Sequence, residues 1–215
     1  MAINNILVIG ASGYLGSEFV RYLLTKKCKI YGTYNKNKTK CLDDARVKYL
    51  KFNTLDLKNY KSLENIKFDY VVNFSGYVNH SSFDNGGIKI IENHLIGLFN
   101  LINFFLDKKI KKFINIGSSD EYGSVKINSK ESFREEPFAP YSFAKTASSH
   151  FLQMINKAHN IDINIIRFFL VYGPRQEKNR LIPAIIDGCL KDQIIKTSPG
   201  MQFRDFLYID DAMDA

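Results

Sequence analysis

The sequence GASGYLG occupies residues 10–16 and follows the apolar run NILVI at residues 5–9. Residues 17–26 come next, with apolar side chains at helical spacing. A short apolar run that enters a glycine turn is typical of a buried parallel strand. Glycine allows a tight turn and close approach to a pyrophosphate, and the following helix N-terminus offers free N–H groups. This context favours a dinucleotide-binding turn over a glycine turn that binds nothing.

Apolar segments of strand length alternate with helical segments along the chain. We predict strands at the following residues: 5–9, 29–34, 47–52, 70–74, 113–116 and 163–169. The longer helices are predicted at residues 88–105 and 141–158. Strands that alternate with helices imply a parallel sheet covered on both faces. The sequence therefore predicts an α/β fold with a doubly wound, Rossmann-type sheet.

The pattern changes near residue 173. We expect residues 1–172 to form the dinucleotide-binding domain, with a loop over the site at residues 125–140. Residues 173–215 contain a short helix near 182–190 and strand-like pieces between 194 and 210. A helix begins at Asp210 just before the chain stops, so we expect a truncated substrate-binding part whose remainder is largely missing.

Composition excludes several other classes of protein. The chain has 215 residues and a net charge of +8, but its lysines fall in short groups at expected ends of helices and strands, which disfavours nucleic acid. No apolar run approaches the length of a membrane span, and no secretory signal precedes residue 5, so we expect a cytoplasmic protein. Cys28, Cys41 and Cys189 have no CxxC spacing and predict reduced thiols without a metal site.

The segment after the second strand bears on the cofactor. Dinucleotide folds often carry an acidic residue there that binds the adenosine ribose. This chain has Tyr34, Asn35 and Lys36 instead, and basic side chains accommodate a 2′-phosphate. We therefore favour NADP(H) over NAD(H); the alternative is a lysine-rich loop exposed to water. Asp56, after the third strand, is placed to accept hydrogen bonds from adenine.

The segment YSFAK at residues 141–145 pairs a tyrosine with a lysine one helical turn later. An ammonium group near Tyr141 favours the phenolate, so Tyr141 can accept a proton from a substrate hydroxyl while hydride leaves the same carbon. Ser118 and Ser119 follow the fifth strand, at the edge where open α/β sheets bind ligands. We predict that Ser118 positions the reacting oxygen.

Taken together, these segments resemble the extended short-chain dehydrogenases/reductases, of the NAD-dependent epimerase/dehydratase group that modifies nucleotide sugars. The similar segments are GASGYLG at residue 10, NFSG at residue 73, GSSDEYG at residue 117, YSFAK at residue 141, RFFLVYGPRQ at residue 167 and RDFLYIDDAMDA at residue 204. The resemblance covers almost the whole chain.

The resemblance implies a role for individual residues. Those expected to act in catalysis are Ser118, Asp120, Tyr141 and Lys145. Those expected to bind the cofactor are Gly10, Ser12, Gly13, Tyr14, Leu15, Gly16, Tyr34, Lys36, Asp56, Leu57, Phe74, Ser75, Gly76, His94, Tyr141 and Lys145. Those expected to bind the substrate are Ser118, Ser119, Tyr141, Leu170, Arg175 and Arg204.

Two positions depart from the group. Many members have Asn at the positions of His94 and Leu170, so the Asn proton relay and one substrate contact are in question here. Asp120 stands where dehydratases carry a catalytic Glu, but epimerases and reductases often have an acid there too. Asp120 therefore does not distinguish the reactions.

We predict hydride transfer at a sugar carbon, C4 for preference, and within that group a 4-keto sugar reductase. The alternatives are a nucleotide-sugar 4-epimerase or 4,6-dehydratase, and a dinucleotide-binding regulator without turnover. Members of the group commonly pair through a four-helix bundle, so we also expect a homodimer through residues 88–105 and 141–158.

Overall fold

The computed structural model describes residues 3–38, 41–123 and 128–215. The chain divides into two compact units, Met1–Arg167 and Phe168–Ala215. We placed the change from a cofactor-binding to a substrate-binding part after residue 172; that functional division stays a prediction.

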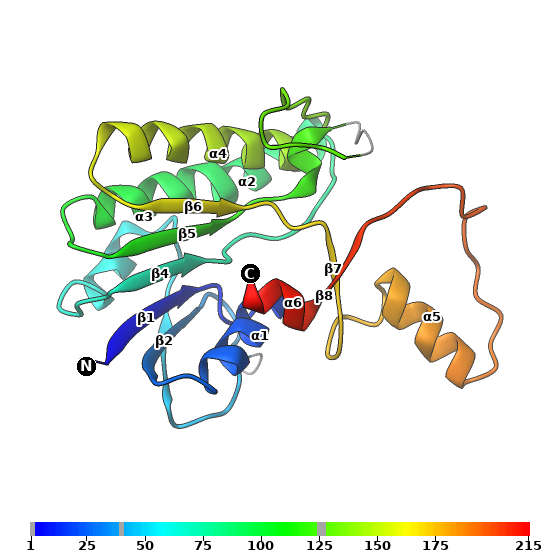
Figure 1. Ribbon diagram of the computed structural model, residues 1–215, viewed down its shortest axis with the longest axis horizontal. Coiled ribbons are helices and arrows are strands. Elements are labelled where there is room, and N and C mark those ends of the chain that lie inside the picture. The colour runs from blue at the N-terminus through cyan, green and yellow to red at the C-terminus, as the bar shows by residue number, and fades with distance from the viewer. Residues whose placement is uncertain (1–2, 39–40, 124–127) are drawn as a thin grey trace. The chain divides into compact units, whose positions relative to one another are not determined.

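The first unit is built on a parallel sheet of six strands in the order β3-β2-β1-β4-β5-β6 (Figure 1). The strands are β1 (Asn4–Ile9), β2 (Cys28–Tyr34), β3 (Val47–Lys51), β4 (Tyr70–Asn73), β5 (Lys112–Ile116) and β6 (Ile163–Ile166). The chain runs outward from β1 to β3 and then returns to β4 on the other side. The strand order therefore reverses between β1 and β4, and doubly wound sheets bind ligands at the carboxyl ends of the strands at such a reversal. The predicted strands and fold class are confirmed.

Side chains of β1 alternate between two cores because successive residues of a strand point to opposite faces. Leu7 and Ile9 lie in a core that contains residues of α3 (Gly97–Phe105) and α4 (Pro140–Ala158). Val8 lies in a second core with residues of α1 (Tyr14–Leu23). Helices therefore cover both faces of this part of the sheet, and α4, α2 and α3 lie on the same side in Figure 1.

The helix predicted at residues 88–105 is interrupted. It consists of α2 (Gly87–Ile91), a π-helical turn, η4 (Glu92–Ile96), and α3. A π-helical turn carries an extra residue and often lies at a functional site. Here it contains His94, one of the expected cofactor-binding residues.

Short helical turns follow several strands of the first unit. They are η2 (Leu57–Ser62), η3 (Phe83–Asn85) and η5 (Ser119–Tyr122). The sequence did not predict them, since three to six residues carry too little periodicity. In the predicted loop at 125–140, residues 125–127 lie outside the described residues, and residues 128–139 contain neither helix nor strand, as expected.

The second unit contains a small parallel pair, β7 (Leu170–Tyr172) with β8 (Phe206–Tyr208), and the helices α5 (Leu181–Leu190) and α6 (Ile209–Asp214). The helix near 182–190 and a strand between 194 and 210 are confirmed. The sequence analysis missed β7, because three residues carry no periodicity of their own. It also extended the sixth strand to residue 169, whereas β6 ends at Ile166.

Cys28, Cys41 and Cys189 are free thiols. Within residues 3–38, 41–123 and 128–215, no cluster of side chains is suited to hold a metal ion, and no helix has the length and apolar character that crossing a membrane requires.

Candidate active site

The turn at residues 10–16 needs glycine at two of its positions for reasons of shape. Gly10 has φ +78°, in the left-handed region that favours glycine, and a Cβ there would lie 3.0 Å from the backbone of Phe74 and Ser75. A Cβ on Gly16 would lie 2.3 Å from the carbonyl oxygen of Gly10. Gly13 is different, since its φ is −81° and a Cβ there would meet nothing closer than 3.4 Å.

The exposed Gly13 leads directly into α1, and the turn fits a phosphate group. Among the described residues no side chain caps this helix N-terminus, and no acidic residue lies in its first turn. The backbone N–H groups of the first turn of α1 and the positive end of its dipole therefore lie at the glycine turn, an arrangement that binds a pyrophosphate in dinucleotide-binding folds. Ser12, Tyr14 and Leu15 are partly buried around the same turn.

The expected adenosine-binding residues lie at the carboxyl ends of β2 and β3. Tyr34 ends β2 and is partly buried, while Lys36 and Leu57 are exposed. Asp56 caps η2: its Oδ1 accepts from Lys58 N at 3.0 Å and its Oδ2 from Asn59 Nδ2 at 2.5 Å. The carboxylate that we assigned to adenine is therefore already oriented by two hydrogen bonds.

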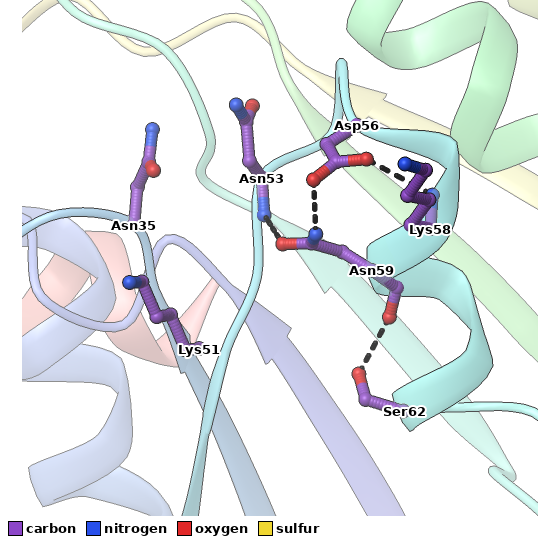
Figure 2. A pocket seen from close by; sticks show the side chains of 7 residues that line it. All are labelled: Asn35, Lys51, Asn53, Asp56, Lys58, Asn59 and Ser62. Atoms are coloured by element: carbon purple, nitrogen blue, oxygen red, sulfur yellow. Dashed lines mark hydrogen bonds between the residues drawn. The ribbon is translucent and has the colours of Figure 1, made fainter.

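A hollow with a volume of about 420 Å³ lies at this end of the proposed site. Figure 2 shows the side chains that line it. Its lining residues are Asn35, Lys51, Asn53, Asp56, Lys58, Asn59 and Ser62. We had considered only lysines 36 and 38 as groups for a 2′-phosphate. Lys51 and Lys58 add two cations on the wall of the hollow. Sequence reasoning missed them, because Lys51 lies on a strand and Lys58 lies on a 3₁₀ turn that was not predicted.

The segment after β4 is fixed by two buried asparagines that sequence reasoning missed. Asn73 and Asn115 are paired in the register of β4 and β5, and Asn73 Nδ2 donates to Asn115 Oδ1 at 2.8 Å. Asn73 Oδ1 accepts from both N and Oγ of Ser75. Phe74, Ser75 and Gly76 thus leave the end of β4 in a defined path beside the glycine turn, where Gly10 approaches them.

Tyr141 and Lys145 lie together at the start of α4, as predicted. Lys145 Nζ is 5.9 Å from the centre of the Tyr141 ring and donates to the carbonyl oxygen of Ile116 at 2.6 Å. Both side chains are buried, with 5% and 7% of their surface exposed. Burial lowers the pKa of Lys145 to about 8, and the carboxylate of Glu121 opposes that shift. The ammonium group thus stands close to the phenol ring.

Ser118 lies at the start of η5, directly after β5. Its Oγ accepts from Asp120 N at 3.2 Å, and its own backbone N–H donates to Glu121 Oε1 at 2.8 Å. These reciprocal bonds form a capping box, which fixes the backbone of Ser118. Ser119 is the first residue of η5 and is partly buried.

Glu121 connects this turn to the rest of the unit, and sequence reasoning missed it. Its side chain is fully buried, and its Oε2 accepts from Ser149 Oγ at 2.6 Å and Arg167 Nε at 2.8 Å. Arg167 Nη2 also donates to Glu135 at 2.6 Å. Burial raises the pKa of Glu135, but a backbone hydrogen bond to its carboxylate and the Arg167 guanidinium together outweigh burial, so the pKa falls below its usual value. Sequence reasoning considered only the neighbouring carboxylate of Asp120 in this segment.

His94 lies against the other side of Tyr141. The two ring centres are 5.2 Å apart and nearly perpendicular, and a Cβ on Gly76 would lie 2.1 Å from the imidazole. His94 Nε2 is 3.0 Å from the carbonyl oxygen of Tyr77. Burial and the charge of Lys145 lower the pKa of His94 to about 3, so the imidazole is neutral. The residue that replaces the expected Asn therefore bonds to the backbone of the segment after β4.

His80 is a second histidine beside Tyr141, and we had given it no role. Its ring lies edge-on to Tyr141, with 5.6 Å between the ring centres, and its Nδ1 is 3.7 Å from Asp120 Oδ2. His80 therefore connects Tyr141 to Asp120, whose backbone N–H in turn donates to Ser118.

The remaining expected substrate residues belong to the second unit. Leu170 begins β7 and is 43% exposed, Arg175 has φ +66°, and Arg204 Nη1 donates to the carbonyl oxygen of Phe203 at 3.1 Å. Their role in substrate binding stays a prediction.

Residues 6–215 match the family described as the NAD dependent epimerase/dehydratase family. The chain belongs to this family. Among curated members, it is 29% identical to dTDP-D-glucose 4,6-dehydratase of Dictyostelium discoideum, which it matches over 99% of its own length and 54% of the relative's. It is 26% identical to UDP-glucuronate 4-epimerase of Thermodesulfobacterium geofontis, over 95% of its own length and 68% of the relative's.

Solved structures of the family have the same fold. UDP-glucuronic acid 4-epimerase from Bacillus cereus, in complex with UDP-glucuronic acid and NAD, matches with a TM-score of 0.84 and 27% identity. The match covers 97% of this chain and 70% of that protein. The chain thus spans about half to seven-tenths of the length of these relatives.

Proposed function

We propose that the protein transfers hydride at a carbon of a nucleotide-linked hexose, C4 for preference, with Tyr141 as the acid/base. The observation that carries this proposal is the buried contact between Tyr141 and Lys145 at the head of α4, in a chain that also has an uncapped helix N-terminus at its glycine turn. Membership of a family whose members act on nucleotide sugars supports it.

Each residue of the site has a distinct task in this proposal. Tyr141 moves a proton to or from the substrate oxygen, and Lys145, held by the Ile116 carbonyl, places a positive charge beside the phenol and favours its ionised form. Ser118 hydrogen-bonds the reacting oxygen from a turn that Glu121 fixes. A nicotinamide dinucleotide held at the glycine turn supplies or accepts the hydride.

Within this chemistry, we propose reduction of a 4-keto sugar with NADP(H) as the first candidate. Lys36 follows β2, and Lys51 and Lys58 line the hollow beside Asp56, so three cations lie near the place where a 2′-phosphate is bound in such folds. The volume of the hollow, about 420 Å³, leaves room for a phosphate group there.

The second candidate is a 4-epimerase or 4,6-dehydratase. Both reactions occur among the relatives by name, and the B. cereus epimerase was solved with NAD. In these reactions the cofactor is regenerated within each turnover, so a tightly held NAD is expected rather than stoichiometric consumption of NADPH.

Cofactor absorbance separates the candidates. The purified full-length protein is analysed for bound NAD(H) or NADP(H), and NADH and NADPH are then supplied with UDP-, dTDP-, GDP- and CDP-hexoses and their 4-keto forms. Oxidation of one NADPH for each 4-keto sugar supports the reductase, whereas turnover without net change in absorbance supports the epimerase or dehydratase. Cofactor binding without turnover on any sugar supports a regulator and contradicts both candidates.

We also propose a homodimer through a four-helix bundle. Apolar side chains on α2, α3 and α4 are exposed in the single chain, among them Ile88, Phe99, Phe143 and Met154. Two such faces packed together would remove these side chains from water, which is the main driving force of such association. A monomer in multi-angle light scattering at micromolar concentration would contradict the dimer.

A further inference from the structure

His80 and Asp120 form a polar pair beside the proposed acid/base, and hydride transfer as described above gives His80 no task. The pair comes from two segments, since His80 follows β4 and Asp120 lies in η5, and the His80 ring contacts Tyr141 of α4. His80 Nδ1 is 3.7 Å from Asp120 Oδ2, and the His80 ring stands at 78° to the Tyr141 ring with 5.6 Å between centres.

Exposure distinguishes this pair from the other neighbours of Tyr141. The side chain of His80 is 55% exposed and that of Asp120 is 31% exposed, whereas His94 and Lys145 are each 7% exposed. His94 and Lys145 also bond to backbone carbonyl oxygens, of Tyr77 and Ile116. His80 is therefore the ring neighbour of Tyr141 that a ligand arriving from solvent can meet.

The ring nitrogen of His80 that faces Asp120 decides which chemical group the other nitrogen, Nε2, recognises. The 3.7 Å between His80 Nδ1 and Asp120 Oδ2 is too long for a hydrogen bond, so the carboxylate acts on the imidazole through its charge. That charge favours a proton on Nδ1, the nitrogen that faces it, over a proton on Nε2, and Nε2 is then a hydrogen-bond acceptor. Because His80 lies beside Tyr141, its Nε2 acceptor would meet a hydrogen-bond donor on a carbon next to the one that reacts. If C4 of the hexose reacts at Tyr141, its neighbour with a donor is C3, which carries a hydroxyl, because C5 carries the ring oxygen.

We propose that His80, oriented by Asp120, accepts a hydrogen bond from the hydroxyl next to the reacting carbon of the hexose. This makes His80 a specificity-determining residue that selects sugars with a 3-hydroxyl over 3-deoxy sugars. A site built to bond a substrate hydroxyl rejects the analogue without it, because the polar group of the site is then left unpaired. The inference rests on the proposed function, since it takes C4 as the reacting carbon.

Equilibrium binding tests the inference without turnover. The full-length protein, saturated with NADPH or with NADH according to which one it binds, is titrated in a calorimeter with UDP-glucose or dTDP-glucose, whichever binds more tightly. The same titration is made with the 3-deoxy counterpart of that sugar nucleotide, and with UDP or dTDP alone. For the natural sequence we expect the 3-deoxy sugar to bind about tenfold to a hundredfold more weakly than the parent. In His80→Phe we expect both sugars to bind equally, with the affinity of the 3-deoxy sugar.

Three further variants sharpen this result. His80→Gln keeps an acceptor and should regain part of the discrimination, while Asp120→Asn, which weakens the hold on Nδ1, should lose part of it. His159→Phe is the matched control, because the exposed His159 follows the opposite end of α4 from Tyr141. Binding of NADH and of the nucleotide alone should stay unchanged in all of them, which also shows that they are folded.

Two outcomes overturn the inference. In one, His80→Phe still prefers the parent sugar by the original factor. In the other, His80→Phe loses as much affinity for the nucleotide alone as for the sugar nucleotide, so the loss does not come from a sugar hydroxyl. Failure of the proposed function is a separate result: Tyr141→Phe would then leave turnover of every sugar nucleotide unchanged, whatever His80→Phe does to binding.

Discussion

The glycine turn and the cluster around Tyr141 are the two parts of the proposed active site, and they are built differently. The turn consists of seven consecutive residues, 10–16, and its shape depends on backbone conformation and on close approach between backbone atoms. The cluster brings together His80, His94, Ser118 and Tyr141 from four separate segments, and its shape depends on side-chain contacts. A local sequence pattern can specify the first, whereas the second exists only after the chain has folded.

The largest expected effect is on catalysis, at the centre of the cluster. Tyr141→Phe removes the hydroxyl that moves the proton, so we expect turnover to fall by a factor of about 10² to 10⁴. Steady-state kinetics with the sugar nucleotide identified in the cofactor assay measures the loss. Tyr70→Phe, at the amino end of β4, is the matched control and should keep full activity. Unchanged NADH binding in Tyr141→Phe would show that the turn functions independently of the cluster.

A second effect concerns the stability of the cluster. Glu121→Gln leaves Arg167 without one of its two buried carboxylate partners, so we expect the free energy of unfolding to fall by about 3 kcal/mol. Urea denaturation measures it. Asp162→Asn breaks the more exposed ion pair with Lys112 and should cost less than about 1 kcal/mol. Equal losses in the two variants would mean that the buried network does not hold the turn of Ser118 in place.

Substitutions at Gly16 and Gly13 test whether steric fit determines the shape of the glycine turn. Gly16→Ala places a Cβ against the carbonyl oxygen of Gly10 and should destabilise the fold by about 1–3 kcal/mol. Gly13→Ala meets only ordinary contacts, so its unfolding free energy should stay close to that of the natural sequence while NADH binding weakens. Urea denaturation of both variants measures the free energy of unfolding, and titration with NADH measures their affinity for the cofactor. If Gly13→Ala lost stability as Gly16→Ala does, steric fit within the turn would not explain the difference between the two positions.

The last expected effect concerns how the free energy of unfolding depends on pH. The pKa of His94 in the folded protein, about 3, lies below the ordinary value of 6.5, so between these values the unfolded chain binds more protons than the folded one. Stability therefore rises with pH in that window, by up to about 1.4 kcal/mol per pH unit. His94→Gln should flatten the dependence of the unfolding free energy on pH between 4 and 6.5, whereas His159→Gln should not. An unchanged slope in His94→Gln would show that His94 does not remain neutral through this range.

Much of the sheet could be predicted from the sequence, because its strands are short apolar runs separated by turns or helices. The helix at residues 88–105 was predicted as one piece, since its apolar spacing does not reveal the π-helical turn at Glu92–Ile96. The strand β7 was missed because three residues carry no periodicity of their own. In the site, Tyr141 and Lys145 were predicted because helical spacing alone makes them neighbours.

The sequence by itself determined the order of strands and helices, the glycine turn, and the pairing of Tyr141 with Lys145, because each depends on residues close together in the chain. Only the tertiary structure decided that His80 and His94 lie on the Tyr141 ring, that Glu121 holds Ser118, and that Asn73 meets Asn115. The physical reason is that these contacts join segments tens of residues apart, and it is the packing of strands and helices around the sheet that brings such segments together.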